Sequence, residues 1–338
     1  MNLKDRLLKK STIESAATLS SSRLFEKKEI ISLECPGLNV ALSGDAFGGM
    51  TPGIVQIAAA SKTFKSKFAL EIAKSFLKKF PEGVIILYDS EFGTPESYFE
   101  DLSIENIIHV PILDLEEFKH DIVVELKEIT REDKVLIIVD SIGNMPSIKE
   151  LTDAEEGKDT ADMTRAKQMK SIFRMIMPRI NQKDVYCVIV NHVYTEQKMY
   201  GKDVPTGGTG SIYNSNVIWT ISKAKEKDSV TSEVSGKKVE ELVGYNFTIT
   251  NYKSRFVKED TKFTITVKFD SGIEKWSGMI ELAEKLGYLI RPTAQSYARK
   301  DKPEETFKRN QIENDDAFWT ALFAETNFNE AIKGEYQL

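Results

Sequence analysis

A lysine and a hydroxyl residue stand together directly behind an apolar run. The run GIVQIAA leads through one alanine into SKTFKS, which ends in Lys65 and Ser66. This ending is typical of the phosphate-binding loop G-x-x-x-x-G-K-[ST]. Here Ala59 and Phe64 occupy the two glycine positions. Taken alone, the stretch fits a nucleotide-binding loop or a surface turn that contains Lys-Ser.

The backbone requirements of such a loop can be met here. A phosphate loop binds its anion through backbone N–H groups and a helix N-terminus. No proline removes a donor between Ala59 and Ser66. We expect Phe64 to adopt a right-handed backbone where the helix begins, Lys65 to reach the terminal phosphates and Ser66 to bind Mg²⁺. The other residues predicted to contact the nucleotide in this loop are Ser61, Lys62, Thr63 and Phe64.

Three further apolar runs also end in polar residues. They are VIILYD (84–89), VLIIVD (135–140) and VYCVIV (185–190), and Ser90-Glu91, Ser141 and Asn191-His192 follow them. Near-continuous hydrophobicity is typical of parallel strands that are covered on both faces. Ligands of open α/β sheets bind outside the carboxyl ends of the strands. We therefore expect these polar residues to meet the Lys65 loop at one edge of a sheet.

Each polar residue at this edge has a chemical and a structural interpretation. Asp140 is the candidate second carboxylate of the metal site, which strengthens the nucleotide interpretation. Glu91 is the candidate for orienting the attacking water, or else a helix-capping or loop carboxylate. His192 would sense the terminal phosphate or simply cap its strand.

The order of the patterns predicts an α/β fold with three parts. Residues 1–30 are predicted to form an arm that begins with a short helix. Strand and helix patterns alternate from 31 to 271, and the period-two runs NVIWTIS, YNFTITNYK and KFTITVKFD predict an antiparallel extension of a mostly parallel sheet. A polar hairpin excursion separates the first two of these runs. Residues 272–338 are predicted to form a small, mostly helical C-terminal domain.

Composition limits the class of protein. The chain has 338 residues, a net charge of −6 and no apolar run of ~18 residues, which predicts no membrane span. Cys35 and Cys187 are too few for a disulfide framework, which favours a reducing cytoplasm. Seven basic residues against two acidic ones lie in 158–183. On charge alone, a solvated helical face explains that excess better than a nucleic-acid site.

Several motifs together resemble the RecA/Rad51 recombinases, and most closely those of T-even phages. The resemblance covers nearly the whole chain and is carried by LNVALSGDAFGGM, SKTFKS, LYDSEFG, DMTRAKQMKSIFR, NHVY, GGTG, EKWSGMIELAEKLG and AIKGEYQL. The phage branch also has phenylalanine before the loop lysine, whereas Ala59 departs from its glycine. The phage relatives continue past AIKGEYQL with an acidic tail, which this sequence does not contain.

The resemblance implies roles at matching positions of the nucleotide site. It places Glu91 on the glutamate that activates water and Tyr98 on the tyrosine that stacks on adenine; otherwise Tyr98 reads as a core aromatic. His192 takes the place of a glutamine that couples the terminal phosphate to DNA binding. Lys253 and Arg255 match two lysines that reach across a subunit interface to the neighbour's ATP, and arginine suits a bidentate phosphate contact.

The resemblance also implies a DNA surface and partners. One DNA loop would lie at 150–166, before a basic helix with Arg165, Lys167, Lys170 and Arg174. A second would span 194–212, where Gly207, Gly208 and Gly210 indicate a mobile loop or a glycine-rich turn without function. The arm would pack on the next subunit of a helical filament on single-stranded DNA. Homologous duplex DNA, a phage single-strand-binding protein and a recombination mediator are the other implied partners, in the cytoplasm of an infected bacterium.

These expectations combine into a DNA-dependent ATPase that pairs and exchanges homologous strands. Two rivals remain open. A RecA-fold ring helicase would also hydrolyse ATP, but Lys253, Arg255 and the N-terminal arm favour the recombinase. A nucleotide-gated DNA-binding regulator would bind ATP with little turnover; Ala59 favours it and Glu91 argues against it.

Overall fold

A nine-stranded sheet forms the centre of the protein. The computed structural model describes all residues except 14, 159–162, 196–202 and 232–237. Within the described chain the strand order is β11-β10-β9-β8-β1-β5-β4-β2-β3. The strands are β1 (Gly53–Ala59), β2 (Val84–Asp89), β3 (Ile107–Pro111), β4 (Val135–Asp140), β5 (Tyr186–Asn191), β8 (Val217–Thr231), β9 (Lys238–Ser254), β10 (Lys262–Lys268) and β11 (Gly272–Ile273). The predicted runs 53–59, 84–89 and 135–140 are confirmed, and the fourth is shifted by one residue.

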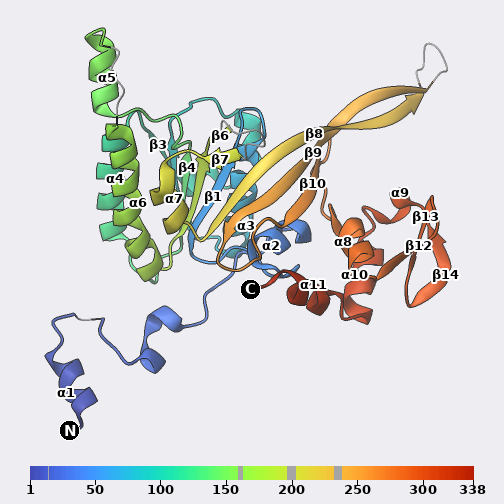
Figure 1. The fold of residues 1–338 in the computed structure, drawn as a ribbon, viewed down its shortest axis with the longest axis horizontal. Helices are drawn as coiled ribbons and strands as arrows, with labels where there is room; N and C mark the ends of the chain where they lie inside the picture. Colours follow the sequence, from blue (N-terminus) through green and yellow to red (C-terminus); the bar gives the residue numbers. More distant parts are fainter. Residues whose placement is uncertain (14, 159–162, 196–202, 232–237) are drawn as a thin grey trace.

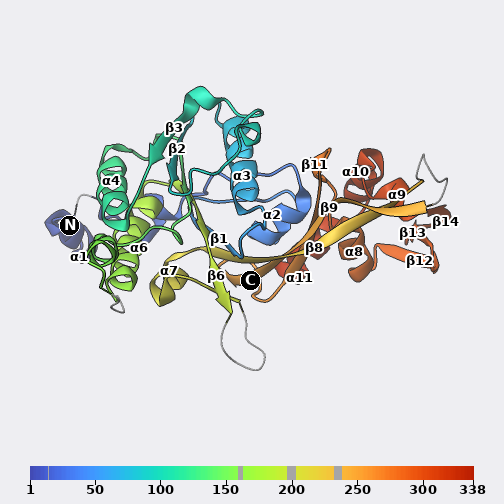
Figure 2. The same cartoon turned by 90° about the horizontal axis from the view of Figure 1, so that it is seen from above.

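Helices cover both faces of the parallel half of the sheet, which explains the continuous hydrophobicity of its strands. Along β1, Val55 and Ile57 join a core with α3, whereas Ile54 points to the opposite core with α4 and α6. Figure 2 shows α4 and α6 on one side of the strands and α2 and α3 on the other. The covering helices are α2 (Pro36–Ser43), α3 (Lys65–Lys79), α4 (Leu115–Glu128) and α6 (Thr164–Gln182).

The period-two strands extend the sheet in antiparallel fashion, as predicted. β8 pairs with β1 in parallel and with β9 in antiparallel orientation, and β9 pairs with β10. Beyond the body of the molecule, β8 and β9 continue together as a long two-stranded ribbon (Figure 1). The predicted hairpin excursion is therefore an extension of the strands themselves, and residues 232–237 within it lie outside the described chain.

The C-terminal region contains a sheet that the sequence patterns missed. Its strands are β12 (Leu289–Thr293), β13 (Ser296–Arg299) and β14 (Lys302–Phe307), and its helices are α8 (Met279–Lys285), α9 (Arg309–Ile312), α10 (Asp316–Glu325) and α11 (Phe328–Tyr336). The strands are short and two of them are largely exposed, so they carry little hydrophobic pattern. Trp276 and Trp319 stack at 6.0 Å between ring centroids in the core of this region.

The N-terminal arm has little core of its own. It contains α1 (Leu3–Lys10) and two short 3₁₀ turns, Leu19–Ser21 and Arg23–Phe25, and none of these elements buries a residue. Figure 1 shows α1 well away from the body of the molecule. In the described part of the chain no helix is both long and apolar enough to span a membrane. The predicted fold class, a RecA-like α/β core with a small C-terminal domain, is confirmed.

Candidate functional site

The four strands that carry the predicted site residues are neighbours in the sheet. Their order is β1-β5-β4-β2. Ala58 pairs with Asn191 across β1 and β5, and Asp89 pairs with Asp140 across β2 and β4. Because these strands are parallel, their carboxyl ends share one edge of the sheet. The structure therefore brings the phosphate loop, Glu91, Asp140 and His192 together, as the sequence predicted.

The predicted phosphate-binding loop, residues 59–66, is called the phosphate loop below. It contains two residues with positive φ angles. Lys62 has a φ of 62°, and Phe64 has φ 56° and ψ 30°. The expectation of a right-handed backbone at Phe64 was wrong, because the chain must reverse sharply between β1 and α3. A left-handed residue with a Cβ costs roughly 1–2 kcal/mol. The Phe64 ring offsets part of this cost by packing on Phe247 at 5.2 Å and on Tyr245 at 5.9 Å between centroids.

The backbone at position 59 does not require glycine, so Ala59 fits there without strain. It is fully buried in β1, where it pairs with Ile221 of β8 and has no positive φ. The loop is held from within by the Thr63 hydroxyl, which donates to the Ala60 carbonyl at 2.8 Å. It is held from outside by the Lys223 ammonium group, which donates to the Lys62 carbonyl at 2.5 Å. Ser61 and Lys62 are exposed.

The Lys65 side chain lies inside the loop. Its Nζ donates to the carbonyls of Ala59 at 3.2 Å and Ala60 at 3.0 Å. Burial lowers the pKa of Lys65, while Glu91 and Asp140 act in the opposite direction. Lys65 also begins the 15-residue helix α3, whose N-terminal N–H groups favour an anion. The loop thus combines a buried ammonium group with the N-terminus of a helix.

Asp140 and Ser66 fit a hydrated magnesium ion. Asp140 is buried, and its Oδ1 has no hydrogen-bond partner. Burial raises the pKa of Asp140 to about 6, and a hydrogen bond with Ser66 opposes this rise. A buried, incompletely paired carboxylate beside a hydroxyl is a donor set that a hard cation satisfies. The observation supports the predicted metal-binding role of both residues.

Glu91 is oriented by its neighbours toward the same edge. Its Oε1 accepts from the Ser141 hydroxyl at 2.6 Å and from the Asn144 amide at 2.8 Å. His192 Nε2 lies 3.6 Å from that oxygen. Burial and the nearby Lys65 lower the pKa of His192, which favours its neutral imidazole, while Glu91 acts in the opposite direction. A fixed carboxylate beside a neutral imidazole can accept a proton from, or orient, a water molecule.

Tyr98 lies on the α3 side of this edge. It belongs to the 3₁₀ turn Glu96–Tyr98 and is half-buried. Lys67, in the first turn of α3, places its Nζ 5.7 Å from the Tyr98 ring centroid. The ring is therefore close to the helix that follows the phosphate loop, and it is partly exposed.

Lys253 and Arg255 are not brought to this edge. Lys253 pairs with Ile218 of β8, whereas the phosphate loop begins beyond the pair Ala59–Ile221. The Lys253 ammonium group donates to the carbonyls of Ser215 and Tyr213, and burial lowers its pKa. Arg255 is exposed. Both cations thus lie toward the other end of the sheet from the loop of their own chain.

The predicted DNA-binding cations of α6 divide into two kinds. Lys167, Lys170 and Arg174 are exposed. Arg165 instead donates to the carbonyls of Gly143 at 2.6 Å and Met145 at 3.0 Å. It fixes the turn after β4, which also carries Asn144. In the first predicted loop, α5 occupies Ile148–Glu155 and residues 159–162 lie outside the described chain.

The second predicted loop is more regular than its glycines indicated. It contains β6 (Val193–Thr195), β7 (Asp203–Pro205) and α7 (Gly208–Asn214), and residues 196–202 lie outside the described chain. Gly207 and Gly208 have positive φ values of 95° and 67° at the start of α7. At Gly210 a Cβ would approach Lys170 Cα to 3.0 Å, so the glycine permits close packing on α6.

Sequence reasoning placed Ser141 at this edge but missed its contact with Glu91, and it missed the other polar groups that support the site. Ser141 and Asn144 hold Glu91, Lys223 holds the phosphate loop, and Gln56 hydrogen-bonds inside the core. The signal for Gln56 was present, because a glutamine interrupts the apolar run GIVQIAA. The contacts of Asn144 and Lys223 arise only from folding.

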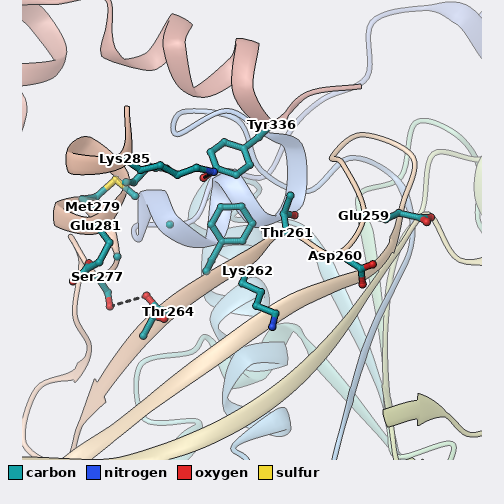
Figure 3. A pocket seen from close by; sticks show the side chains of 14 residues that line it. Glu259, Asp260, Thr261, Lys262, Thr264, Ser277, Met279, Glu281, Lys285 and Tyr336 are labelled. Carbon is teal, nitrogen blue, oxygen red and sulfur yellow. Dashed lines mark hydrogen bonds between the residues drawn. The ribbon is translucent and has the colours of Figure 1, made fainter. Parts of the chain in front are cut away.

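A separate cavity lies between β10 and the C-terminal region. Its volume is 460 Å³, and none of the predicted site residues lines it. Figure 3 shows Lys285 reaching toward Tyr336, and Ser277 hydrogen-bonded to Thr264 of β10. The carboxyl edge of the sheet, where the chemically active side chains converge, remains the candidate nucleotide site.

Comparison with known proteins supports the same assignment. Residues 276–332 match the family model described as "Bacteriophage T4, Recombination and repair protein, C-terminal domain". The whole chain is 40% identical over 347 residues to the "Recombination and repair protein" of Enterobacteria phage T4, and the match covers 86% of that protein. This chain belongs to the UvsX-like family of phage recombinases.

Proposed function

We propose that this recombinase is a DNA-dependent ATPase that forms a helical filament on single-stranded DNA and exchanges homologous strands. The observation that carries the proposal is the convergence of Lys65, Asp140, Glu91 and His192 at one sheet edge. Membership of the recombination and repair family supports DNA as the macromolecular ligand. Single-stranded DNA and a homologous duplex are therefore the proposed substrates.

Each residue of the edge has a proposed task in nucleotide binding and turnover. Lys65 leaves the Ala59 and Ala60 carbonyls to contact the terminal phosphates, and Ser61, Lys62, Thr63 and Phe64 supply backbone donors. Ser66 and Asp140 hold Mg²⁺, which neutralises phosphate charge when bound. Glu91 orients the attacking water and accepts its proton, Tyr98 stacks on adenine, and His192 contacts the terminal phosphate.

Lys253 and Arg255 are proposed to act on the neighbouring subunit. Their position away from the phosphate loop of their own chain supports this role, because they can stabilise phosphoryl charge only where a second chain presents its nucleotide. Such a head-to-tail contact generates a filament when it does not close into a ring. The arm 1–30, with exposed Leu24 and Phe25, is proposed to pack on the next subunit.

The DNA surface is proposed to lie over α6 and α7. Lys167, Lys170 and Arg174 would contact phosphates, while Gly207, Gly208 and Gly210 allow α7 to begin sharply and to pack on α6. Arg165 supports this surface indirectly through the turn after β4. A phage single-strand-binding protein and a recombination mediator are proposed partners, and the host cytoplasm is the proposed location.

The test is ATP turnover with and without single-stranded DNA at two salt concentrations. We expect DNA to stimulate turnover strongly and the stimulation to weaken at high salt, because phosphate contacts release counterions. An ATP turnover rate that is the same with and without single-stranded DNA would contradict the proposal. Negative-stain microscopy of the ATP-bound complex distinguishes filaments from the closed rings of a helicase.

Glu91→Gln separates a recombinase ATPase from a regulator that only binds ATP. The amide keeps the shape of the side chain but cannot accept a proton, so turnover should fall about 10²–10⁴-fold. ATP-dependent DNA binding should remain, because Lys65, Ser66 and Asp140 are unchanged. Turnover that survives the substitution would show that Glu91 is not the catalytic base.

A further inference from the structure

A chain of buried polar side chains crosses the core behind the candidate site. Gln56 of β1, Asn191 of β5 and Ser215 after α7 are all 0% exposed. Thr206, after β7, contacts the same group. We call these four residues the Gln56 network. Buried polar groups without partners cost several kcal/mol, so their presence in an otherwise apolar core requires that each is paired.

The hydrogen bonds of the Gln56 network run in one direction. The Asn191 amide donates to Gln56 Oε1 at 3.1 Å, and Gln56 Nε2 donates to Ser215 Oγ at 3.1 Å. Ser215 Oγ then donates to the Ser211 carbonyl of α7 at 2.9 Å. Asn191 Oδ1 accepts from the Thr206 hydroxyl and from the His192 backbone N–H, which fixes the orientation of the Asn191 amide.

The two ends of the network adjoin the residues proposed to contact phosphate, His192 and Lys253. One end is the backbone N–H of His192, whose ring lies 3.6 Å from Glu91. The other end is Ser215, whose carbonyl accepts from Lys253, the proposed cation for the neighbour's nucleotide. Between them lies α7, which packs on α6 at Gly210 and Lys170.

We propose that the Gln56 network positions α7 according to the nucleotide state of both adjoining sites. This inference rests on the proposed function and adds residues that touch neither nucleotide nor DNA. A terminal phosphate that engages His192 displaces the Asn191 end, and one that engages Lys253 removes a cation from the Ser215 carbonyl. Because hydrogen bonds are directional, a movement at either end of the network would change the position of α7. Apolar contacts would not couple the side chains in this way, because they allow the side chains to move past one another.

The test compares variants in the middle of the network with a matched control. Gln56→Met keeps length and burial but removes both polar ends, and Ser215→Ala removes one hydroxyl. Ser75→Ala removes a similarly buried hydroxyl from α3, outside the network. ATP turnover is measured without DNA and with saturating single-stranded DNA. Both network variants should keep DNA-free turnover within about twofold but lose about tenfold of the DNA stimulation, and Ser75→Ala should keep both rates.

The outcomes separate this inference from the proposed function. A wild-type protein without DNA stimulation contradicts the proposed function and the inference together. Wild-type-like stimulation in both network variants contradicts the inference alone. DNA-free and DNA-stimulated rates that fall in parallel also contradict it, because a loss of stability lowers both.

Hydrogen exchange gives a second readout if a variant folds poorly. In the wild-type protein, amide exchange at 208–214 should slow when a nonhydrolysable ATP analogue is added before DNA. In Ser215→Ala the same addition should leave exchange at 208–214 unchanged. Equal slowing in the two proteins would overturn the inference.

Discussion

Asp140, which we propose binds a cation, lowers the stability of the fold when no cation is bound. Its carboxylate is buried with an unpaired Oδ1, and burial raises its pKa to about 6 from 3.8. In the unfolded chain the same group ionises at its ordinary pKa, so folding disfavours the ionised form. A purely structural residue at this position would be neutral, which is why the carboxylate points to a bound cation.

Replacing Asp140 with asparagine should stabilise the nucleotide-free protein at neutral pH. Below about pH 4 aspartate is protonated in both states, so the two proteins should unfold alike. Between about pH 4 and 6 the folded wild type binds more protons than the unfolded chain, so its stability falls as pH rises. Above about pH 6 the advantage of Asp140→Asn should be constant, at about 1–3 kcal/mol. Urea unfolding across this range measures the difference.

The same substitution should abolish Mg²⁺-dependent ATP binding, which provides the control. A variant that is no more stable than wild type at pH 7, or whose advantage persists unchanged at pH 4, would contradict the assigned ionisation of Asp140. The comparison requires metal-free buffer, because a cation at the site would stabilise only the wild type.

The phosphate loop is the element in which backbone strain and packing oppose each other. Phe64 holds a left-handed backbone that glycine adopts freely, yet its ring packs on Tyr245 and Phe247. Phe64→Gly and Phe64→Ala both remove the ring, but only alanine retains the strain. We therefore expect the glycine variant to be more stable than the alanine variant by about 1 kcal/mol.

Urea unfolding of the two Phe64 variants measures this difference. The entropy of the unfolded chain alone predicts the reverse order, because glycine loses more backbone freedom on folding than alanine does. An alanine variant that equals or exceeds the glycine variant would show that the loop relaxes to a right-handed backbone once the ring is gone. Both variants should be less stable than wild type through the lost aromatic contacts.

Helix α6 carries exposed cations, which we propose bind DNA, and one cation, Arg165, that is bonded to backbone carbonyls. Arg174 is exposed, so Arg174→Ala should weaken single-stranded DNA binding and reduce the slope of log K against log salt by about 0.7. Arg165 is bonded to backbone carbonyls, so Arg165→Ala should lower stability by about 1–3 kcal/mol and leave the slope unchanged. Titrations at several salt concentrations measure the slopes; equal slopes for both variants would contradict this division.

Helices and strands could be predicted from the sequence where the pattern of apolar residues along the chain determines them. β1, β2 and β4 have the predicted bounds because burial on both faces requires continuous apolar runs. β3 was missed because His109 and Pro111 interrupt its apolar residues, which are not buried at the sheet edge. Asp140 and Glu91 were found because polar residues follow buried strands. The backbone conformation predicted for Phe64 was wrong because it depends on the turn at Lys62 and on contacts with Tyr245 and Phe247, which lie far away in the sequence.

At the scale of the whole molecule, the position of the arm bears on the proposed assembly. Its root is fixed to the core by Asp184, which accepts from Lys28 at 2.5 Å and from Arg131 at 2.6 Å. The remainder of the arm is largely exposed and buries nothing in its helical turns. An arm that is anchored at its root and exposed over the rest of its length is suited to contact a second chain. Such a contact would set the distance between successive nucleotide sites.

Two inactive variants should therefore restore activity when mixed. Glu91→Gln inactivates the nucleotide site of its own chain but keeps Lys253 and Arg255 for the neighbouring chain. The double variant Lys253→Ala and Arg255→Ala keeps an intact nucleotide site but supplies no cations to the neighbouring chain. In a random equimolar filament about a quarter of the interfaces combine an intact site with intact cations. ATP turnover with single-stranded DNA should therefore rise to about a quarter of the wild-type rate, although each variant alone is nearly inactive.

If the mixture stayed as inactive as its components while still forming filaments, both groups would belong to one site in one chain. The control is a triple variant that combines Glu91→Gln with Lys253→Ala and Arg255→Ala. When this triple variant replaces Glu91→Gln in the mixture, turnover should remain absent, because the triple variant supplies neither an intact site nor the cations.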